Sequence, residues 1–340
     1  MISFKNDYNV LAASKIIDAL VKYKEEENIG YGEDYHTKNV SNLIKELTKT
    51  DVDSYLLVGG TQTNLVGLSH ILKESYNAVI SVRGGHITVH ETGAIEGTNH
   101  KVIEMKAENG KANVSNLIEV YNQYKDYHMV KPHALYISNA TEIGTIYYKD
   151  ELKALYNECK KLGLYLFLDG ARLSQALSAS DNDLTLEDIA KNTDMFYLGG
   201  TKNGCPTGEL LVVCNDNLKE DFKYAIKNRG ALLAKGFFQG ICFEEYLKDN
   251  YFLELAAKAN LMADTLREEL KDYLVYPNTT NQVFLKVKPL DIKELEKEFI
   301  FEIWEEHEDF SIIRIVTTYA TKYENVKKFI KMFKNIKNNM

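Results

Sequence analysis

A single lysine follows an apolar segment at the point where the chain turns. In DMFYLGGTKNG, residues 194–204, Lys202 comes after a predicted strand and two glycines. A lysine in this place is a solvated strand-end residue, a phosphate ligand, or a nucleophile whose amine has lost its proton in a desolvated loop. The residue alone leaves these three roles open.

A carboxylate stands at the end of a second apolar segment. In LYLFLDGARL, residues 164–173, Asp169 follows five apolar residues, and Gly170 lets the chain leave the sheet. A buried carboxylate is costly unless it meets a positive partner, although Asp169 could equally cap the next helix. Arg172 could compensate Asp169 or bind a substrate carboxylate, because its planar guanidinium suits that group.

Two further features follow predicted strands. In LLVGGTQTNL (56–65), Gly60 and Thr61 open a helical segment. The free backbone N–H groups at such a start favour an anion such as phosphate, and a simple strand-to-helix turn is the alternative. In RGGHITVHETGA (83–94), His86 could lie over an aromatic cofactor ring, relay protons or close a turn, with His90 and Glu91 near it in sequence.

An amine, a carboxylate and an anion site together meet the needs of one class of cofactor. An aldehyde that carries a phosphate and a protonatable ring nitrogen needs an amine to form an imine, a carboxylate for the ring nitrogen and an anion-binding turn. Lys202, Asp169 and the turn at Gly60 supply these three groups. The combination favours the nucleophile role for the lysine.

The elements that must position these residues are short strands and amphipathic helices. Segment 149–163 shows apolar residues at helical spacing, and Gly163 is suited to end that helix. Apolar strands separated by such helices predict a mostly parallel seven-stranded sheet sandwiched by helices, with any site along one edge. The seven predicted strands are 54–58, 77–82, 100–105, 133–138, 164–168, 194–198 and 209–214.

The pattern changes after about residue 243. A long charged helical stretch leads into two predicted strands and an amphipathic C-terminal helix, which indicates a smaller α+β domain. We therefore predict an N-terminal segment plus a large α/β domain over 1–243, and a small C-terminal α+β domain over 244–340. The predicted C-terminal elements are a helical stretch at 244–271, strands at 281–288 and 311–319 that flank a helix, and a C-terminal helix at 324–336.

Composition excludes several classes of protein. The net charge of -8 argues against a general nucleic-acid binder, which needs a basic surface. No apolar run approaches membrane-spanning length, and the first residues do not resemble a signal peptide. The four cysteines lie far apart without a C-x-x-C pair, so a reduced, cytoplasmic setting and no metal site are predicted.

With these residues in place, the chain resembles the pyridoxal-phosphate-dependent enzymes of aspartate-aminotransferase fold (fold type I). Within them it resembles the threonine aldolase/β-eliminating lyase family. The resemblance covers nearly the whole chain, and its features follow one another in the expected order. They are SFKND at the start, YGED (31–34), the turn at Gly60 and Thr61, His86 with Glu91, DGAR (169–172), the Lys202 loop and IIRIVT (312–317).

The resemblance implies a role for each cofactor residue. Lys202 would bind the aldehyde of pyridoxal 5′-phosphate covalently, and Asp169 would pair with the pyridine nitrogen and keep it protonated. His86 would stack on the ring. Gly60 and Thr61 would hold the phosphate.

The resemblance also implies a substrate site and a shared assembly. Arg172 and Arg314 would hold the substrate carboxylate, with Arg172 also next to the cofactor. Asn6, Asp7 and Glu91 would lie at the edge of the substrate. The family's enzymes form homodimers or homotetramers with shared active sites, and Lys235 in RGALLAKG (229–236) would reach the neighbouring subunit's phosphate.

The implied activity is cleavage of the Cα–Cβ bond of a β-hydroxy-α-amino acid, with L-threonine giving glycine and acetaldehyde. Three positions depart from the family pattern. SNATEIG, with Thr141 and Glu142, stands where many aldolases carry a histidine; Phe238 replaces an arginine, and Asn6 replaces a serine. The alternatives are β-elimination or transamination of another amino acid, possibly an aromatic one, and, from another class, a nucleotide-binding or structural α/β protein.

Overall fold

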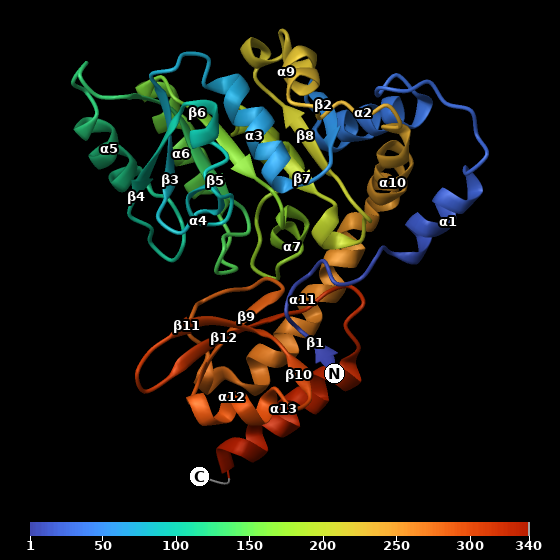
Figure 1. The fold of residues 1–340 in the computed structure, drawn as a ribbon, viewed down its shortest axis with the longest axis vertical. Helices are drawn as coiled ribbons and strands as arrows, with labels where there is room; N and C mark the ends of the chain where they lie inside the picture. The colour runs from blue at the N-terminus through green and yellow to red at the C-terminus, as the bar shows by residue number, and fades with distance from the viewer. Residues whose placement is uncertain (339–340) are drawn as a thin grey trace.

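The computed structural model describes residues 1–338. Its larger part is a seven-stranded sheet with the strand order β2-β8-β7-β6-β5-β3-β4, in which only β8 runs antiparallel to its neighbours (Figure 1). All seven predicted strands are present, so the predicted fold class is confirmed. The strands are β2 (Asp53–Leu57), β3 (Asn77–Val82), β4 (Lys101–Met105), β5 (Lys131–Ser138), β6 (Tyr165–Asp169), β7 (Met195–Gly199) and β8 (Glu209–Val213).

Helices cover both faces of this sheet because side chains alternate between its faces. Along β6, Leu166 and Leu168 pack in one core and Phe167 in the other. Helices α3 (Gly60–Ile71) and α9 (Phe222–Asn228) cover the Phe167 face. The other face is covered by α2 (Tyr35–Thr48), α5 (Val114–Gln123), α6 (Lys149–Leu162), α8 (Leu186–Lys191) and α10 (Phe237–Leu247).

Two glycines are required where they stand, one by close packing and the other by backbone conformation. A Cβ on Gly67 of α3 would lie 2.6 Å from Cε2 of Phe167, so only glycine lets α3 approach the sheet this closely. Gly163 ends α6 with φ +70°, as predicted, in the left-handed region that glycine adopts at little cost.

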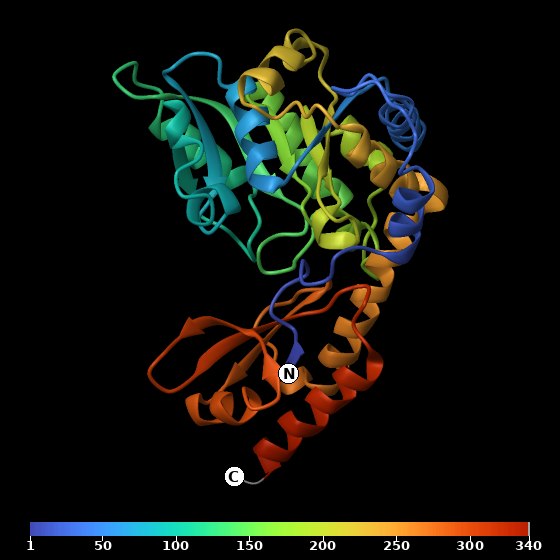
Figure 2. The ribbon, with the colours of Figure 1, turned by 45° about the vertical axis from the view of Figure 1, so that its right-hand side comes forward.

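The smaller part is a three-stranded antiparallel sheet with helices against it (Figure 2). The strands predicted at 281–288 and 311–319 are confirmed as β9 (Gln282–Val287) and β12 (Ser311–Val316). The third strand, β11 (Glu302–Glu306), was not predicted, because this charged strand lies half-exposed at the edge and has no apolar face to reveal it. The helices are α11 (Tyr251–Glu269), α12 (Pro289–Leu295) and α13 (Tyr323–Asn338).

The helical stretch predicted over 244–271 is helical over most of its length, but it is divided between two helices. Helix α10 ends at Leu247 and α11 begins at Tyr251, because Asp249 and Asn250 between them adopt φ +52° and +56°. Asp and Asn tolerate this left-handed conformation better than most residues do. Helix α11 then runs from the large sheet to the small domain (Figures 1 and 2).

The N-terminal residues lie with the C-terminal part of the chain. Strand β1 (Ile2–Ser3) pairs in parallel with β10 (Phe299–Ile300), and Phe4 packs in the core of the small domain. The division into 1–243 and 244–340 stays a prediction. Of the helices in residues 1–338, none combines the length and apolar composition needed to cross a bilayer.

Candidate active site

Two of the predicted site residues, Asp169 and Lys202, lie where the neighbouring strands β6 and β7 end. Asp169 is the last residue of β6, and Ser138 of β5 lies opposite it. Lys202 lies in a short 3-10 turn, Thr201–Asn203, just after β7. Parallel strands bring their carboxyl ends to one edge of a sheet, which explains why residues distant in sequence meet there.

Asp169 is a buried carboxylate surrounded by donors. Its Oδ2 accepts hydrogen bonds from Asn64 Nδ2 (3.1 Å) and from the Tyr136 hydroxyl, and its Oδ1 accepts one from the Ala171 N–H (3.0 Å). Burial alone would raise the pKa of Asp169, but His86 nearby and hydrogen bonds from Tyr136 and Tyr197 hold it below its usual value. The side chain caps no helix, because α7 (Leu173–Leu177) has no side-chain cap. An ionised carboxylate therefore faces the site.

His86 is held from behind by a second buried carboxylate. Glu91 Oε1 accepts hydrogen bonds from His86 Nδ1 (2.7 Å) and Asn64 Nδ2 (2.7 Å), and the other oxygen of Glu91 has no partner. We assign the proton to His86 Nδ1, because the carboxylate can only accept. The Glu91 side chain is fully buried and orients the imidazole, and its predicted contact with the substrate stays a prediction.

The Lys202 amine has no hydrogen bond or ion pair with any residue in 1–338. Burial, followed by the nearby Arg172 guanidinium, lowers the pKa of Lys202, which favours the neutral, nucleophilic amine. Glu209, which pairs with Gly199 across β8 and β7, was missed by the sequence analysis. Its Oε2 accepts the Gly200 N–H (2.9 Å), and burial raises its pKa to about 8. The sequence signal for it was a single glutamate at the start of the apolar segment ELLVV.

The predicted anion turn has the expected form. Helix α3 begins at Gly60, and its first backbone bond joins Thr63 N–H to Gly59 O (3.0 Å). The N–H groups of Gly60, Thr61 and Gln62 therefore have no partner inside the helix. A Cβ on Gly59 would meet nothing within 4 Å, whereas one on Gly60 would lie 3.2 Å from the Tyr197 hydroxyl. The open turn thus lies beside the Asp169 network.

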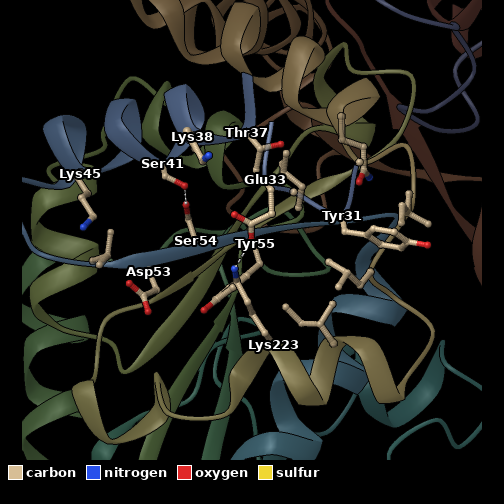
Figure 3. A pocket seen from close by; sticks show the side chains of 18 residues that line it. Tyr31, Glu33, Thr37, Lys38, Ser41, Lys45, Asp53, Ser54, Tyr55 and Lys223 are labelled. Carbon is tan, nitrogen blue, oxygen red and sulfur yellow. Dashed lines mark hydrogen bonds and ion pairs between the residues drawn. The ribbon is translucent and has the colours of Figure 1, made fainter. Parts of the chain in front are cut away.

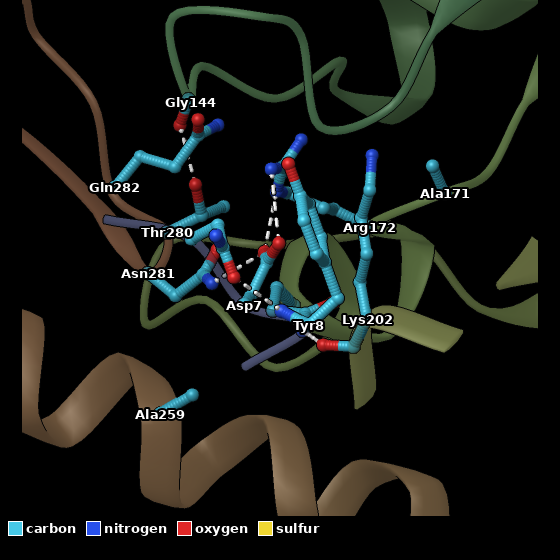
Figure 4. A network of polar contacts seen from close by, with 12 residues as sticks. Asp7, Tyr8, Gly144, Ala171, Arg172, Lys202, Ala259, Thr280, Asn281 and Gln282 are labelled. Carbon is cyan, nitrogen blue, oxygen red and sulfur yellow. Dashed lines mark hydrogen bonds and ion pairs between the residues drawn. The ribbon is translucent and has the colours of Figure 1, made fainter. Parts of the chain in front are cut away.

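Arg172 already has a carboxylate partner in this structure. Its Nε and Nη2 bind Asp7 Oδ2 (2.7 Å) and Oδ1 (3.1 Å), and Asn281 Nδ2 also donates to Asp7 (3.0 Å; Figure 4). Asp7 is the buried counter-ion of Arg172, and its predicted place at the edge of the substrate stays a prediction. Asn6 accepts the Tyr8 N–H (3.2 Å) and so shapes the same N-terminal turn.

Arg314 keeps one donor unused. Its Nη2 pairs with Glu302, its Nη1 donates to Gln282 Oε1 (3.2 Å), and its guanidinium lies 4.8 Å from the centre of the Trp304 ring. Its Nε is buried and has no hydrogen-bond partner within residues 1–338. Burial and the nearby Arg172 lower the pKa of Arg314, so the two guanidinium groups lie near each other, and their shared role at a substrate carboxylate stays a prediction.

Lys235 lies elsewhere on the subunit surface. The loop at 229–236 is tied to the loop at 30–32 by a bond from the Tyr31 N–H to Ala234 O (3.2 Å), and Lys235 is exposed. Its predicted contact with a neighbouring subunit stays a prediction.

A separate pocket of about 350 Å³ lies between α2, β2, α9 and α10 (Figure 3). Its polar groups largely satisfy one another: Ser41 Oγ bonds Ser54 Oγ (3.0 Å), and Lys223 pairs with Glu33 (2.7 Å). None of the predicted site residues lines it. This pocket is therefore separate from the candidate site at the sheet edge.

Removing Arg172 tests the buried ion pair. Arg172→Met leaves the Asp7 carboxylate buried without its counter-ion, so we expect the free energy of unfolding to fall by about 3–5 kcal/mol. Urea denaturation at neutral pH measures this. The double variant Asp7→Asn/Arg172→Met is expected to lose less, because no unpaired charge remains. Lys191→Met removes an exposed pair with Glu187 and serves as the control, with an expected change of about 0.5 kcal/mol. A loss in Arg172→Met no larger than in this control contradicts the prediction.

The ion pair between Asp7 and Arg172 also makes the free energy of unfolding depend on pH. Burial raises the pKa of Asp7, but Arg172 and Lys202 more than offset this and hold it below its usual value. Because the pKa of Asp7 is lowered in the folded state, its ionised carboxylate stabilises the fold fully above the unfolded aspartate pKa of about 4. The contribution is lost as the pH falls through the lower, folded value.

Comparison with known proteins agrees with this geometry. The model of the β-eliminating lyase family matches residues 12–289. The low specificity L-threonine aldolase of Pseudomonas aeruginosa is 34% identical over 274 residues, which are 78% of each chain. A solved structure of Leishmania major threonine aldolase is 43% identical, covers 99% of both chains and superposes with a TM-score of 0.97. Cystalysin from Treponema denticola, whose structure contains pyridoxal 5′-phosphate, shares the fold at 15% identity, with a TM-score of 0.73 over 100% of this chain and 92% of cystalysin.

Proposed function

The chain belongs to the β-eliminating lyase family, and on that premise we propose that it cleaves the Cα–Cβ bond of β-hydroxy-α-amino acids with pyridoxal 5′-phosphate as cofactor. L-threonine is the proposed substrate, giving glycine and acetaldehyde. The names of the aldolases from Pseudomonas aeruginosa and Leishmania major support this choice.

The residues present fit the cofactor. The observation that carries this is the Lys202 amine, which has no partner in residues 1–338 and has a lowered pKa, at the same sheet edge as the ionised Asp169. Lys202 would hold the aldehyde carbon, Asp169 the ring nitrogen, and the N–H groups of Gly60 and Thr61 the phosphate, with His86 over the ring. When bound, the cofactor supplies an electrophilic aldehyde and a ring that accepts the electron pair released by bond cleavage.

The protein's own groups set the charge around this ring. Asp169 stays ionised because Asn64, Tyr136 and Tyr197 donate to it, so it can hold a proton on a heterocyclic nitrogen. Glu91 fixes the tautomer and orientation of His86. These buried bonds are formed before the substrate arrives, so they cost no reorganisation during the reaction.

The two arginines would orient the substrate. Arg314 has an unpartnered buried Nε, which is a free donor for a carboxylate. Arg172 lies near it but is paired with Asp7, so it would act through the hydrogen-bonding capacity that Asp7 leaves unused. A carboxylate held at this point restricts rotation of the substrate and so selects which bond to Cα can break.

A product analysis on purified protein tests the proposed function. With added pyridoxal 5′-phosphate, we expect L-threonine to give acetaldehyde and glycine in equal amounts, measured by reduction of acetaldehyde with a coupled NADH-dependent dehydrogenase and by amino-acid analysis. Ammonia with a keto acid, and no aldehyde, would instead show β-elimination or transamination. Lack of visible absorbance after incubation with the cofactor would contradict both.

We also propose that two or four copies assemble with shared active sites in the cytoplasm. The support is the exposed Lys235 on a loop that is bonded to the 30–32 loop, beside the exposed rings of Tyr31 and Tyr35. Aromatic side chains are enriched where subunits meet, and an exposed lysine supplies a cation for a phosphate group. Sedimentation equilibrium tests the assembly, and a monomer at micromolar concentration would contradict it.

A further inference from the structure

A further carboxyl group, that of Glu142, lies beside the proposed cofactor site. It follows β5, whose last residue, Ser138, pairs with Asp169. Glu142 Oε1 accepts hydrogen bonds from the Ser138 hydroxyl (2.8 Å) and the His86 N–H (2.9 Å). Two donors from two different elements therefore fix the position of this carboxylate.

The second oxygen of Glu142 is available. In the part of the chain that the structure describes, Oε2 has no hydrogen bond to another residue, yet it is not among the buried unpartnered atoms. Glu142 is only partly buried, so this end of its side chain is accessible while Oε1 stays anchored. A carboxylate held by one oxygen and free at the other can accept a proton without moving.

The loop that carries Glu142 is also tied to the substrate arginine. Gln282 donates from Nε2 to the Thr141 carbonyl (3.4 Å) and accepts from Arg314 Nη1 (3.2 Å). Two residues after Glu142, the Gly144 carbonyl accepts the Thr280 hydroxyl (3.0 Å; Figure 4). The Gln282 side chain thus links Thr141, the residue before Glu142, to Arg314, which is proposed to bind the substrate carboxylate.

The charges around Glu142 suit a base. Burial raises its pKa, and the Ser138 hydrogen bond opposes this. A raised pKa gives a carboxylate more drive to take a proton near neutral pH. The charged and titratable groups that face it are His86, Asp169, Arg172, Tyr136 and Tyr147.

We propose that Glu142 is the base that takes the β-hydroxyl proton of the substrate, an inference that rests on the proposed function. The hydroxyl proton moves to Glu142 Oε2, and the O–H electron pair becomes the second bond of the aldehyde carbonyl. The Cα–Cβ bond breaks, and its electron pair stays with the amino-acid fragment. That fragment takes up a proton at Cα and leaves as glycine.

His86 is the competing base, because its Nδ1 donates to Glu91 while its Nε2 has no partner among residues 1–338. Its backbone N–H binds Glu142, so the two groups lie together. The experiment must therefore separate loss of a base from loss of the support that Glu142 gives His86.

The test compares wild type with Glu142→Gln, whose amide keeps the shape and can still accept from Ser138 and His86. We expect kcat for L-threonine to fall by about 10²–10⁴-fold, the range for loss of a general base. The acid limb of the pH profile of kcat/KM, where activity rises as Glu142 loses its proton, should disappear. Glycine has no β-hydroxyl, so its dissociation constant, titrated by visible absorbance, should change by less than about 3-fold.

Two more variants make the result decisive. Ser138→Ala removes a hydrogen bond that lowers the pKa of Glu142, so the acid limb should move to higher pH, which a structural role would not cause. Glu104→Gln, at an exposed pair with Arg83, is the matched control and should behave as wild type. If wild type cleaves L-threonine and Glu142→Gln retains its rate within about 5-fold, or keeps the acid limb, the assignment of the base is wrong. If wild type releases no aldehyde, the proposed function fails, and this inference fails with it.

Discussion

Replacing Lys202 by alanine is expected to lower L-threonine cleavage by on the order of 10⁴-fold or more, as for the loss of other covalent catalytic groups. The reason is that this amine has no hydrogen bond or ion pair in residues 1–338 and has a lowered pKa, so no structural role competes with a covalent one. The variant should fold, because no described contact depends on the amine.

Two measurements check the Lys202 prediction. Borohydride treatment of the cofactor-loaded wild type, followed by peptide mass analysis, should place the cofactor on Lys202, and Lys202→Ala should carry no label. Lys223→Ala, which removes an exposed pair with Glu33, is the matched lysine control and should keep its activity. A label on another lysine, or cleavage by Lys202→Ala at more than about a hundredth of the wild-type rate, would contradict the proposed covalent role of Lys202.

Asp169→Asn is expected to lower kcat by about 10²–10⁴-fold. A neutral amide cannot stabilise a protonated ring nitrogen as a carboxylate does. The change also weakens the hydrogen bonds from Asn64, Tyr136 and Tyr197, so we expect a loss of about 1–3 kcal/mol in the free energy of unfolding. Steady-state kinetics and urea denaturation measure the two effects.

Asp194→Asn is the control for the structural part of this effect. Asp194 is also a buried carboxylate, bonded to Lys160 Nζ (2.6 Å) and the Leu166 N–H (2.7 Å), but it lies just before β7, at the opposite end of that strand from Lys202. This control should lose stability while the folded protein keeps its kcat. If Asp169→Asn lost no more kcat than Asp194→Asn, the proposed role of Asp169 would be wrong.

The sheet and the positions of Asp169 and Lys202 at its edge were predictable because their signals are local. An apolar strand that ends in Asp169, or in two glycines before Lys202, places those side chains at the edge of a parallel sheet whatever the remaining contacts are. Burial on both faces makes such strands apolar along their whole length, which is why all seven were found. Strand β11 was not predicted because it is a half-exposed edge strand without an apolar face. The break before α11 was not predicted because it depends on the backbone conformation of Asp249 and Asn250.

The surroundings of the reactive residues were not predictable, because they join distant parts of the chain. Asp7 lies 165 positions from Arg172, and no sequence pattern near either residue indicates that they form an ion pair. Asn64, Tyr136 and Tyr197 read as ordinary members of a helix and two strands, yet all three donate to Asp169.

The sequence by itself therefore determined the fold class, the family resemblance and the identity of the amine, carboxylate and anion turn, since each depends on residue type and strand or helix period. Tertiary structure alone decided the charge and partner of each group. It left Lys202 unpaired, assigned Asp7 to Arg172, put Glu91 behind His86 and left one oxygen of Glu142 open. The physical reason is that burial and hydrogen bonding set the protonation of a group, and both are known only once the chain has folded.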